Sequence, residues 1–510
     1  MKKEMKKNLF MVAAVALMAM ISCNKEQMSG GQEPQTPQVV EPSYYVEFTA
    51  DLGADEEVAA PTPQSAATKT TYDATDKKTK WLAGDLISVN GKKFEIKEVL
   101  DGGLSARFVN AEELGESFNP PYTAIYPYNA TAGQAVVPAT QTVSDDTFAD
   151  ESVVAVGYSK DDNVLSFRHV CSVVKFTVST SGVTELELSS AGDIAGTISV
   201  NANAGADPAY SVISGSKTIT VKPSSGTFST TATYYVSVLP TLGDATAKQK
   251  LEIKSEGVVV KSGNVHFTRN KVMDAKAIEV KYVYLKPNLV WGISSPRYAT
   301  YFFEGENNEW QSMTDTDKDG VYRAIVPEGY TNLIFCRMNP SSTTNGWTAS
   351  TQLWNKSSDL KVPSSDKPAY ISGIMKWDGA GSWNTLAAAK SYRENAVYLK
   401  PNSNWKQSNA WFAVYLCNGS KGSKWIKMTS VDGTFYGAEL PSDFSATNYK
   451  NIIFTRMNPS KSALDWASKW NQTGDLACSK MTLSPYNRCC AISSGQWDCG
   501  TNVTWTTTLK

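Results

Sequence analysis

Hydrophobic and polar residues alternate along most of this chain. The alternation is clear in YYVEFTA (44–50), DLISVNGKKFEIKEV (85–99), SVVKFTVST (172–180) and KLEIKSEGVVVKSGNVHF (250–267). A period of two places successive side chains on opposite faces of a strand, and Val and Thr are frequent in such runs. Turn residues separate the runs. The pattern predicts an all-β protein built of tandem antiparallel β-sandwiches.

The second half of the chain consists of two similar copies of one sequence. TNLIFCRMNP (331–340) returns as KNIIFTRMNP (450–459), and VYLKPN (283–288) returns at 397–402. The tryptophans also correspond, in the pairs Trp291/Trp405, Trp310/Trp425, Trp347/Trp466, Trp354/Trp470, Trp377/Trp497 and Trp383/Trp505. We therefore expect two copies of one domain, module 1 (281–386) and module 2 (397–510), joined by a connector (387–396).

The N-terminus departs from the strand pattern. A basic segment precedes the apolar run LFMVAAVALMAMIS, which is short for a membrane span and is typical of a secretory signal. The sequence Met20-Ile21-Ser22-Cys23 resembles a bacterial lipobox, so we expect a signal peptide over 1–23, lipid on Cys23 and an outer-membrane anchor facing the cell exterior. The alternative is cleavage without lipidation. Residues 24–43, rich in Pro, Gly and Gln, are expected to form a flexible tether.

The composition argues against several function classes. The net charge of −1 gives no basic surface for nucleic acid, and two histidines, His169 and His266, are too few for most zinc sites and histidine-based catalysis. We expect no enzyme activity, metal or cofactor. DTDKDG (315–320) resembles the start of a calcium loop, but Val326 stands at the twelfth position, so a hairpin turn is favoured.

The cysteines allow a disulfide in module 2. No CxxC pair is present, and an exported protein tolerates disulfides. The sequence leaves the pairing open among Cys417, Cys478, Cys489, Cys490 and Cys499.

Three segments of the first half resemble the fimbrillin-like family of surface lipoproteins. They are KTTYDATDKKTKWLAGDLISV (69–89), YTAIYPYN (122–129) and LSFRHVCSVVKFTV (165–178). The resemblance implies two transthyretin-like sandwiches, 44–160 and 161–280, with Trp81 and the Gly84-Asp85 turn in structural roles. Pilus subunits of this family are cut after an arginine, whereas the first arginine of this chain is Arg107. We therefore expect residues 44–280 to form a fixed stalk.

The repeated strand has two faces. In LIFCR, Leu333, Phe335 and Arg337 should point one way, and Ile334 and Cys336 the other. Phe335 and its counterpart Phe454 are expected in the core. Arg337 and Arg456 are expected to pair with a carboxylate, and Asp359 and Asp475 are the candidates because they recur in both copies.

Six tryptophans recur in both modules, which is more than a small β core needs. Exposed tryptophan commonly marks recognition, and sugar rings present C–H patches that pack on aromatic rings while their hydroxyls seek polar partners. Polar side chains close to these tryptophans in sequence are Asn307, Gln311, Lys424 and Lys427.

The order of motifs VYLKPN, Trp-x-x-Met, IFxRMNP and W…W…DL resembles carbohydrate-binding module family 26, which binds starch. The resemblance implies a β-sandwich whose ligand contacts are strand aromatics, here Tyr301 and Tyr415, and turn aromatics, here Trp310 and Trp425. A second strand aromatic is Phe303 in module 1. Module 2 has Cys417 there, and Trp411, which stands where module 1 has Arg297, is a possible substitute. For Trp347, Trp354, Trp466 and Trp470, core packing is favoured over ligand contact.

The sequence thus predicts a non-catalytic, lipid-anchored surface protein. Its expected partners are starch, amylopectin and maltooligosaccharides, together with surface amylase and glucan-import proteins. The alternative is a fimbrial tip or accessory adhesin that binds other glycans or proteins.

Overall fold

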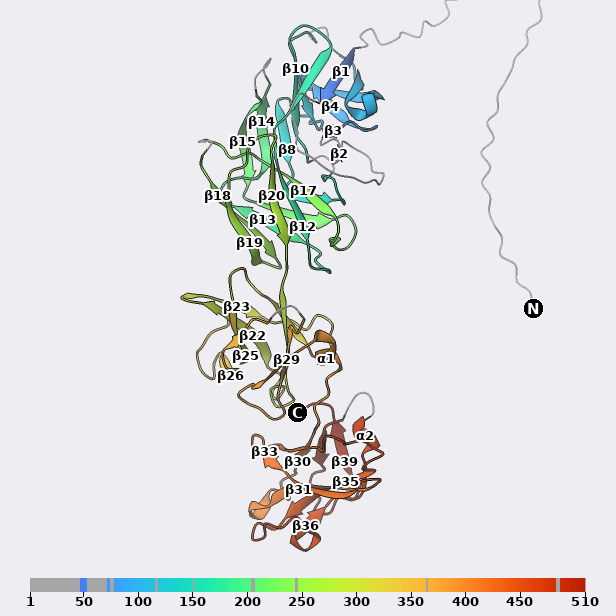
Figure 1. Cartoon of the computed structure of the whole chain (residues 1–510), viewed down its shortest axis with the longest axis vertical. Helices are drawn as coiled ribbons and strands as arrows, with labels where there is room; N and C mark the ends of the chain where they lie inside the picture. Colours follow the sequence, from blue (N-terminus) through green and yellow to red (C-terminus); the bar gives the residue numbers. More distant parts are fainter. Residues whose placement is uncertain are drawn as a thin grey trace, which may run out of the picture. The chain divides into compact units, whose positions relative to one another are not determined.

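The computed structural model describes residues 46–52, 71–73, 78–114, 118–149, 152–202, 207–243, 246–363, 366–482 and 487–509. Within these ranges nearly all regular structure is β, and several sheets form multiple β domains (Figure 1). The all-β prediction is confirmed. No helix in these ranges is long and apolar enough to cross a membrane. The signal peptide, Cys23 and the tether lie outside the described residues.

The first domain is a closed barrel with strand order β1-β11-β10-β7-β4-β5-β6. Trp81 is fully buried in its core, where Phe108, Tyr126 and Phe167 meet it edge-on at 5.0–5.3 Å between ring centroids. The strands are β1 (Glu47–Leu52), β4 (Leu86–Val89), β5 (Lys92–Leu100), β6 (Ser105–Asn110), β7 (Tyr122–Tyr126), β10 (Ala155–Ser159) and β11 (Val164–His169), beside the hairpin β2 (Thr71–Asp73) and β3 (Lys78–Lys80).

The second domain combines three sheets, in the orders β17-β12-β20, β19-β18-β13-β16-β9 and β15-β14-β8. β8 (Gln134–Val137) and β9 (Thr140–Val143) precede residue 160 in the sequence but pair with β14 and β16, which follow it. The other strands are β12 (Ser172–Val178), β13 (Leu186–Ser190), β14 (Ala195–Asn201), β15 (Ala209–Ser216), β16 (Thr218–Pro223), β17 (Thr233–Val238), β18 (Gln249–Ser255), β19 (Val258–Val265) and β20 (Val272–Ile278).

Module 1 has two sheets, β24-β21-β28-β29 and β23-β22-β25-β26, and β27 also pairs with β25. The elements are β21 (Tyr282–Lys286), β22 (Arg297–Glu304), β23 (Asn307–Ser312), β24 (Tyr322–Ile325), β25 (Asn332–Met338), β26 (Leu353–Lys356), β27 (Leu360–Lys361), β28 (Ala369–Ser372), β29 (Gly381–Asn384) and α1 (Leu386–Ser391).

Module 2 repeats this order as β34-β30-β38-β39, with β33 added at the edge, and β32-β31-β35-β36, with β37 beside β35. Its elements are β30 (Ala396–Lys400), β31 (Trp411–Gly419), β32 (Gly422–Lys427), β33 (Thr429–Ser430), β34 (Tyr436–Glu439), β35 (Asn451–Met457), β36 (Lys469–Gln472), β37 (Leu476–Ala477), α2 (Ser479–Thr482), β38 (Cys489–Ile492) and β39 (Val503–Thr506).

The sheets are not purely antiparallel. β1 with β11, β12 with β20, β16 with β9, β21 with β28 and β30 with β38 are parallel pairs. Period-two alternation gives a strand and its faces but not the direction of its neighbour, so the sequence pattern could not predict these pairings.

The two faces of β25 are as predicted. Leu333 and Phe335 lie in the core between the sheets, whereas Ile334 and Cys336 lie on the opposite face. In β35, Phe454 is likewise in the core.

The expected ion pairs of Arg337 and Arg456 are wrong. Arg337 donates from Nε to the carbonyl of Trp291 (2.7 Å), from Nη1 to Asn355 Oδ1 (3.1 Å) and from Nη2 to the carbonyl of Ile293. Arg456 makes the equivalent bonds to Trp405, Asn471 and Gln407. Since the guanidinium is buried, carbonyl oxygens of a neighbouring loop satisfy its fork of N–H groups.

Each of these arginines is also sandwiched between two tryptophans. The guanidinium carbon of Arg337 lies 4.5 Å from the Trp354 ring centroid and 5.3 Å from that of Trp377. Arg456 lies between Trp470 (4.5 Å) and Trp497 (5.2 Å). Cation–π contacts with tryptophan, and not ion pairs with aspartate, therefore stabilise these two guanidinium groups.

The connector is structured in the N-terminal part of its range. Helix α1 begins after Thr385, whose hydroxyl accepts a hydrogen bond from the Ala388 amide. Its Ala389 is fully buried and packs in a cluster with Val321 and Ala369.

The disulfide expectation is wrong for this structure. The seven described cysteines are all buried free thiols. Burial raises the pKa of the Cys478 thiol to about 12 and that of Cys489 to about 11, so both remain protonated at neutral pH.

We predict that Arg337→Lys lowers the free energy of unfolding by roughly 2 kcal/mol, because lysine cannot reproduce the bonded and stacked fork. Asp359→Asn, the control, should change it by less than about 0.5 kcal/mol, since Asp359 is exposed. Denaturant unfolding of the full chain measures both. A larger effect for Asp359 would restore the ion-pair interpretation.

Candidate functional site

The candidate site lies on the outer face of the β23-β22-β25-β26 sheet. The floor of this face in module 1 is Ala299, Ile334, Cys336 and Met338, all buried, and the side chains that cover it include Tyr301, Phe303 and Trp310. Burial raises the pKa of Cys336 to about 12, so this thiol is neutral and acts as part of an apolar floor. A sheet face that points away from the core is therefore hydrophobic and capped by aromatic rings.

Three rings form aromatic cluster 1, consisting of Tyr301, Trp310 and Trp347. Strand pairing sets Tyr301 of β22 directly opposite Trp310 of β23. The ring centroids lie 5.0 Å apart for Tyr301–Trp310, 4.7 Å for Tyr301–Trp347 and 4.7 Å for Trp310–Trp347. The planes are inclined by 56–71° to one another, so the three rings do not form one flat shelf.

Module 2 repeats the arrangement in aromatic cluster 2, consisting of Tyr415, Trp425 and Trp466. All three centroid distances are 4.8 Å, and the interplanar angles are 49–69°. Tyr415 and Trp425 are again directly paired across two strands. The two modules thus carry the same three-ring constellation.

The sequence interpretation of Trp347 and Trp466 as core residues is wrong. Trp347 is 40% exposed and Trp466 is 43% exposed. Both lie in the irregular segment after the repeated RMNP motif, where no period indicates which way a side chain points. Trp466 begins a short 3-10 turn, and the Asp465 carboxylate accepts a hydrogen bond (2.8 Å) from the Ser468 amide there.

Trp354 and Trp470 belong to a different place from the clusters. Each flanks the buried arginine of its module, as described above, and Trp470 is 38% exposed. Their position next to a guanidinium explains why they recur without joining the three-ring site.

The second strand aromatic differs between the modules. Phe303 is stacked on Tyr301 with centroids 5.8 Å apart, so module 1 has a fourth ring. In module 2 its counterpart Cys417 is buried, at an irregularity of the strand where Asn418 has a φ of +60°. The fourth ring is therefore absent from cluster 2.

Trp411 and Arg297 hold loops. Trp411 Nε1 donates to the carbonyls of Asn458 and Lys461, both at 3.0 Å. Arg297 Nε donates to the carbonyl of Ser342 (2.8 Å), and Nη1 donates to Asn345 Oδ1. Both side chains thus brace the segment that carries the third ring, Trp466 or Trp347.

The polar neighbours divide between two faces. Lys427 lies on the face of Trp425, with its Nζ 4.9 Å from the Trp411 ring, and Lys356 Nζ lies 5.8 Å from the Trp347 ring. Gln311 and Lys424 are adjacent in sequence to the cluster tryptophans, so strand alternation turns them to the opposite face.

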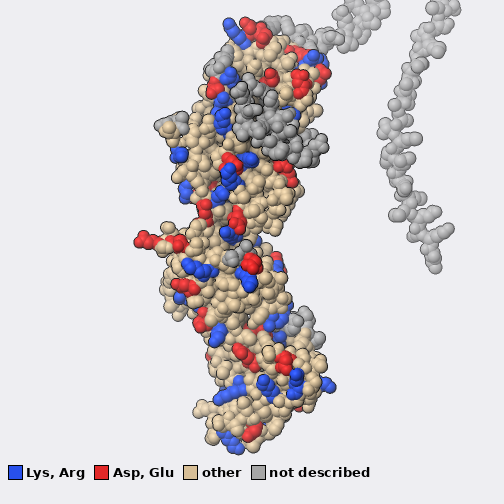
Figure 2. All heavy atoms as spheres, viewed as in Figure 1, with Lys and Arg blue, Asp and Glu red and all other residues tan. Residues whose placement is uncertain are grey.

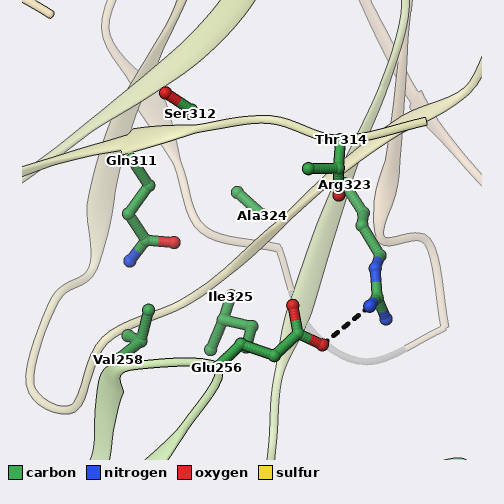
Figure 3. A pocket seen from close by; sticks show the side chains of 8 residues that line it. All are labelled: Glu256, Val258, Gln311, Ser312, Thr314, Arg323, Ala324 and Ile325. Carbon is green, nitrogen blue, oxygen red and sulfur yellow. Dashed lines mark hydrogen bonds and ion pairs between the residues drawn. The ribbon is translucent and has the colours of Figure 1, made fainter. Parts of the chain in front are cut away.

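Gln311 in fact lines a cavity of about 190 Å³, together with Glu256, Val258, Ser312, Thr314, Arg323, Ala324 and Ile325 (Figure 3). The Arg323–Glu256 ion pair, 2.7 Å between Nη2 and Oε1, stands at its side. This cavity is separate from the aromatic clusters and contains none of their rings.

The DTDKDG turn binds its own backbone. The Asp315 carboxylate accepts from the amides of Asp319 (3.1 Å) and Gly320 (2.9 Å), and Asp317 pairs with Lys390. Within the described ranges no group of three or more His, Cys, Asp or Glu is placed to hold a metal ion. On the face drawn in Figure 2, basic and acidic side chains are interspersed and no field of one sign extends across it.

No known family model and no curated protein matches the chain. In structure it is similar to a candidate cell adhesion protein of Bacteroides uniformis, with 17% identity, a TM-score of 0.26 and coverage of 52% of this chain and 96% of the other. A fimbrial assembly protein of Parabacteroides distasonis has 12% identity, a TM-score of 0.23 and coverage of 48% and 92%. A candidate cell adhesion protein of Bacteroides fragilis has 11% identity, a TM-score of 0.23 and coverage of 53% and 98%. Scores of this size describe a general likeness over about half the chain and assign no function.

We predict that Trp347→Ala lowers the free energy of unfolding by less than about 1 kcal/mol, because an exposed ring loses little packing. Trp291→Ala, at a fully buried ring, should cost about 3–5 kcal/mol. Denaturant unfolding compares the two. Equal losses would show that the cluster ring is a core element.

Proposed function

We propose that the protein is a non-catalytic cell-surface lipoprotein that binds glycans through its two aromatic clusters, and that α-1,4-glucans such as starch, amylopectin and maltooligosaccharides are its ligands. The observation that carries the proposal is the recurrence of one partly exposed group of three rings in both modules. A structural core repeats because packing requires it, but partly exposed rings have no such requirement.

The chemistry of the clusters suits a sugar. Aromatic faces offer broad apolar contact to C–H patches. Lys356, over Trp347 of cluster 1, and Lys427, over Trp411 in module 2, offer hydrogen-bond donors to hydroxyls. The rings meet at 49–71°, so a flat ribbon cannot stack on all three at once. A curved chain can, and α-1,4 linkage produces curvature. This inclination favours α-glucans over flat β-1,4 polymers.

Two sites on one chain favour polymeric ligands. When the first site has bound a polymer, the second meets neighbouring sugars at a high effective concentration, which strengthens capture without any new contact. The proposal assigns no catalytic residue.

The proposed location is supported by the sequence of the N-terminal residues. Lipid on Cys23, the tether over 24–43 and a stalk over 44–280 would hold the modules outside the outer membrane. Surface amylase and glucan-import proteins would then use the captured glucan.

The second candidate is a fimbrial tip or accessory adhesin that binds other glycans or proteins. It agrees with the adhesion and fimbrial descriptions of the similar structures. Arg107, the first arginine of the chain, lies in β6 paired with β1, within the barrel. Cleavage there would divide the barrel, so a fixed stalk is favoured over a polymerising subunit.

Affinity electrophoresis of the full chain tests the ligand. We expect retardation in gels with amylopectin and none with dextran or without polymer. Trp310→Ala or Trp425→Ala alone should weaken binding about 10- to 100-fold, and the pair should abolish it. Trp497→Ala is the control, because Trp497 is 42% exposed but lies outside both clusters. Unchanged retardation of the folded double variant would exclude the clusters.

The anchor has its own test. Cys23→Ala should move the protein from the membrane fraction to the soluble exported fraction, because the acyl chains have no attachment point. Membrane fractionation and mass spectrometry of the mature N-terminus measure this. An unlipidated N-terminus in the unchanged protein would contradict the anchor and leave the glucan site untouched.

A further inference from the structure

An apolar cluster runs without interruption from module 1 into module 2. It contains Val283, Trp291, Phe302 and Phe335 of module 1 and also Tyr398, Phe435, Cys489 and Leu509 of module 2. Each of these four module 2 residues is 3% exposed or less. Two domains joined only by a flexible connector would not share a core.

A buried carboxylate spans the junction. Glu394 is 6% exposed, and its Oε2 accepts a hydrogen bond (2.8 Å) from the Leu289 amide of module 1. Its Oε1 accepts one (2.5 Å) from the hydroxyl of Tyr398 in module 2. Desolvation raises the pKa of this carboxyl, and the nearby Arg488 opposes that shift. Glu394 therefore joins a loop of one module to a strand of the other.

Two further contacts tie the same faces together. Trp377 Nε1 of module 1 donates to the carbonyl of Val431 in module 2 (3.0 Å). A Cβ added at Gly437 would come within 2.2 Å of Met375 Sδ, so only glycine permits this close approach without a shift. In module 1 the position that corresponds to Gly437 is occupied by Arg323, which pairs with Glu256 and lies over the Tyr282 ring.

The repeat itself supplies a comparison. The module 1 residues at this face are Leu289, Ile293, Ile374 and Met375, which are partly buried and pack against the shared cluster. The corresponding residues of module 2 are Ser403, Gln407, Ser494 and Gly495, all exposed. The apolar residues of module 1 thus lie at its junction with module 2, whereas their polar counterparts in module 2 are exposed. The sequence thus distinguishes a docking face from a solvent face.

We infer that modules 1 and 2 act as one rigid bivalent unit, in which Glu394 is a positioning residue and the shared core fixes the separation of the two aromatic clusters. This rests on the proposed function for its ligand. A fixed distance between the clusters strengthens binding to a polymer whose two bound segments are the same distance apart. It does not change the affinity for an oligosaccharide that fills only one cluster. The unit should therefore discriminate amylopectin from short maltooligosaccharides more strongly than two loosely linked modules would.

The test replaces the four apolar junction residues of module 1 in the full chain by their polar or small counterparts from module 2. The variant carries Leu289→Ser, Ile293→Gln, Ile374→Ser and Met375→Gly, and a second variant carries Glu394→Ala. Amide hydrogen exchange across 283–298 and 394–400 reports the junction. Calorimetry with maltoheptaose reports single-cluster affinity, and amylopectin binding reports the pair.

We expect faster exchange at the junction, maltoheptaose affinity within about twofold of the unchanged chain, and amylopectin affinity about tenfold lower. Glu394→Gln, which keeps an acceptor oxygen, should retain more protection than Glu394→Ala. If the four-residue variant unfolds, Glu394→Ala supplies the same comparison.

Exchange that is unchanged in both variants would overturn the rigid unit. Faster exchange with undiminished amylopectin affinity would show that rigidity does not serve binding. If the unchanged chain binds neither maltoheptaose nor amylopectin, the proposed glucan function fails, while the exchange result still decides whether the junction is rigid.

Discussion

The strict alternation of side chains along β25 and β35 is the constraint on which each module depends. One set of residues must fill the space between the sheets, as Phe335 and Phe454 do. The other set then faces outward on the same strands, and on β25 it is also apolar, consisting of Ile334, Cys336 and Met338. An apolar outer face needs cover, and the three rings of each cluster give it cover while leaving part of their own surface open.

Comparison of the two modules separates the features that recur from those that differ. The three-ring cluster and the arginine held between two tryptophans recur in both, because one shapes the outer face and the other fixes the loop that contains Trp291 or Trp405. The differences are also interpretable. Cys417 replaces the fourth ring, and Ser494 and Gly495 replace the apolar pair Ile374 and Met375. Site composition and module docking can therefore change independently on one scaffold.

Much of the fold could be predicted from the sequence, for a physical reason. Strand existence and facing follow from period two, so the two sides of β25 were accessible from the pattern, whereas the pairing of Tyr301 with Trp310 was not. Repetition then placed corresponding tryptophans correctly. The sequence pattern could not predict the direction of strand pairing, nor that β8 and β9 pair with β14 and β16 of the second domain. Both depend on contacts between residues distant in sequence.

The errors at the site have the same origin. Trp347 and Trp466 lie in loops without a period, so their direction is set by turn geometry and not by alternation. An ion pair with aspartate is the simplest expectation for a recurring arginine. In the structure, backbone carbonyls and indole faces hold Arg337 instead. A recurring Trp beside a recurring buried Arg is a signal that could have suggested this arrangement.

The central claim is that a glucan chain binds against the three mutually inclined rings of each aromatic cluster. A crystal structure of the full chain with saturating maltoheptaose tests it most directly. Our account predicts glucose rings against Tyr301, Trp310 and Trp347, and against Tyr415, Trp425 and Trp466. Density for the sugar at another surface, with both aromatic clusters open to solvent and empty, would contradict it.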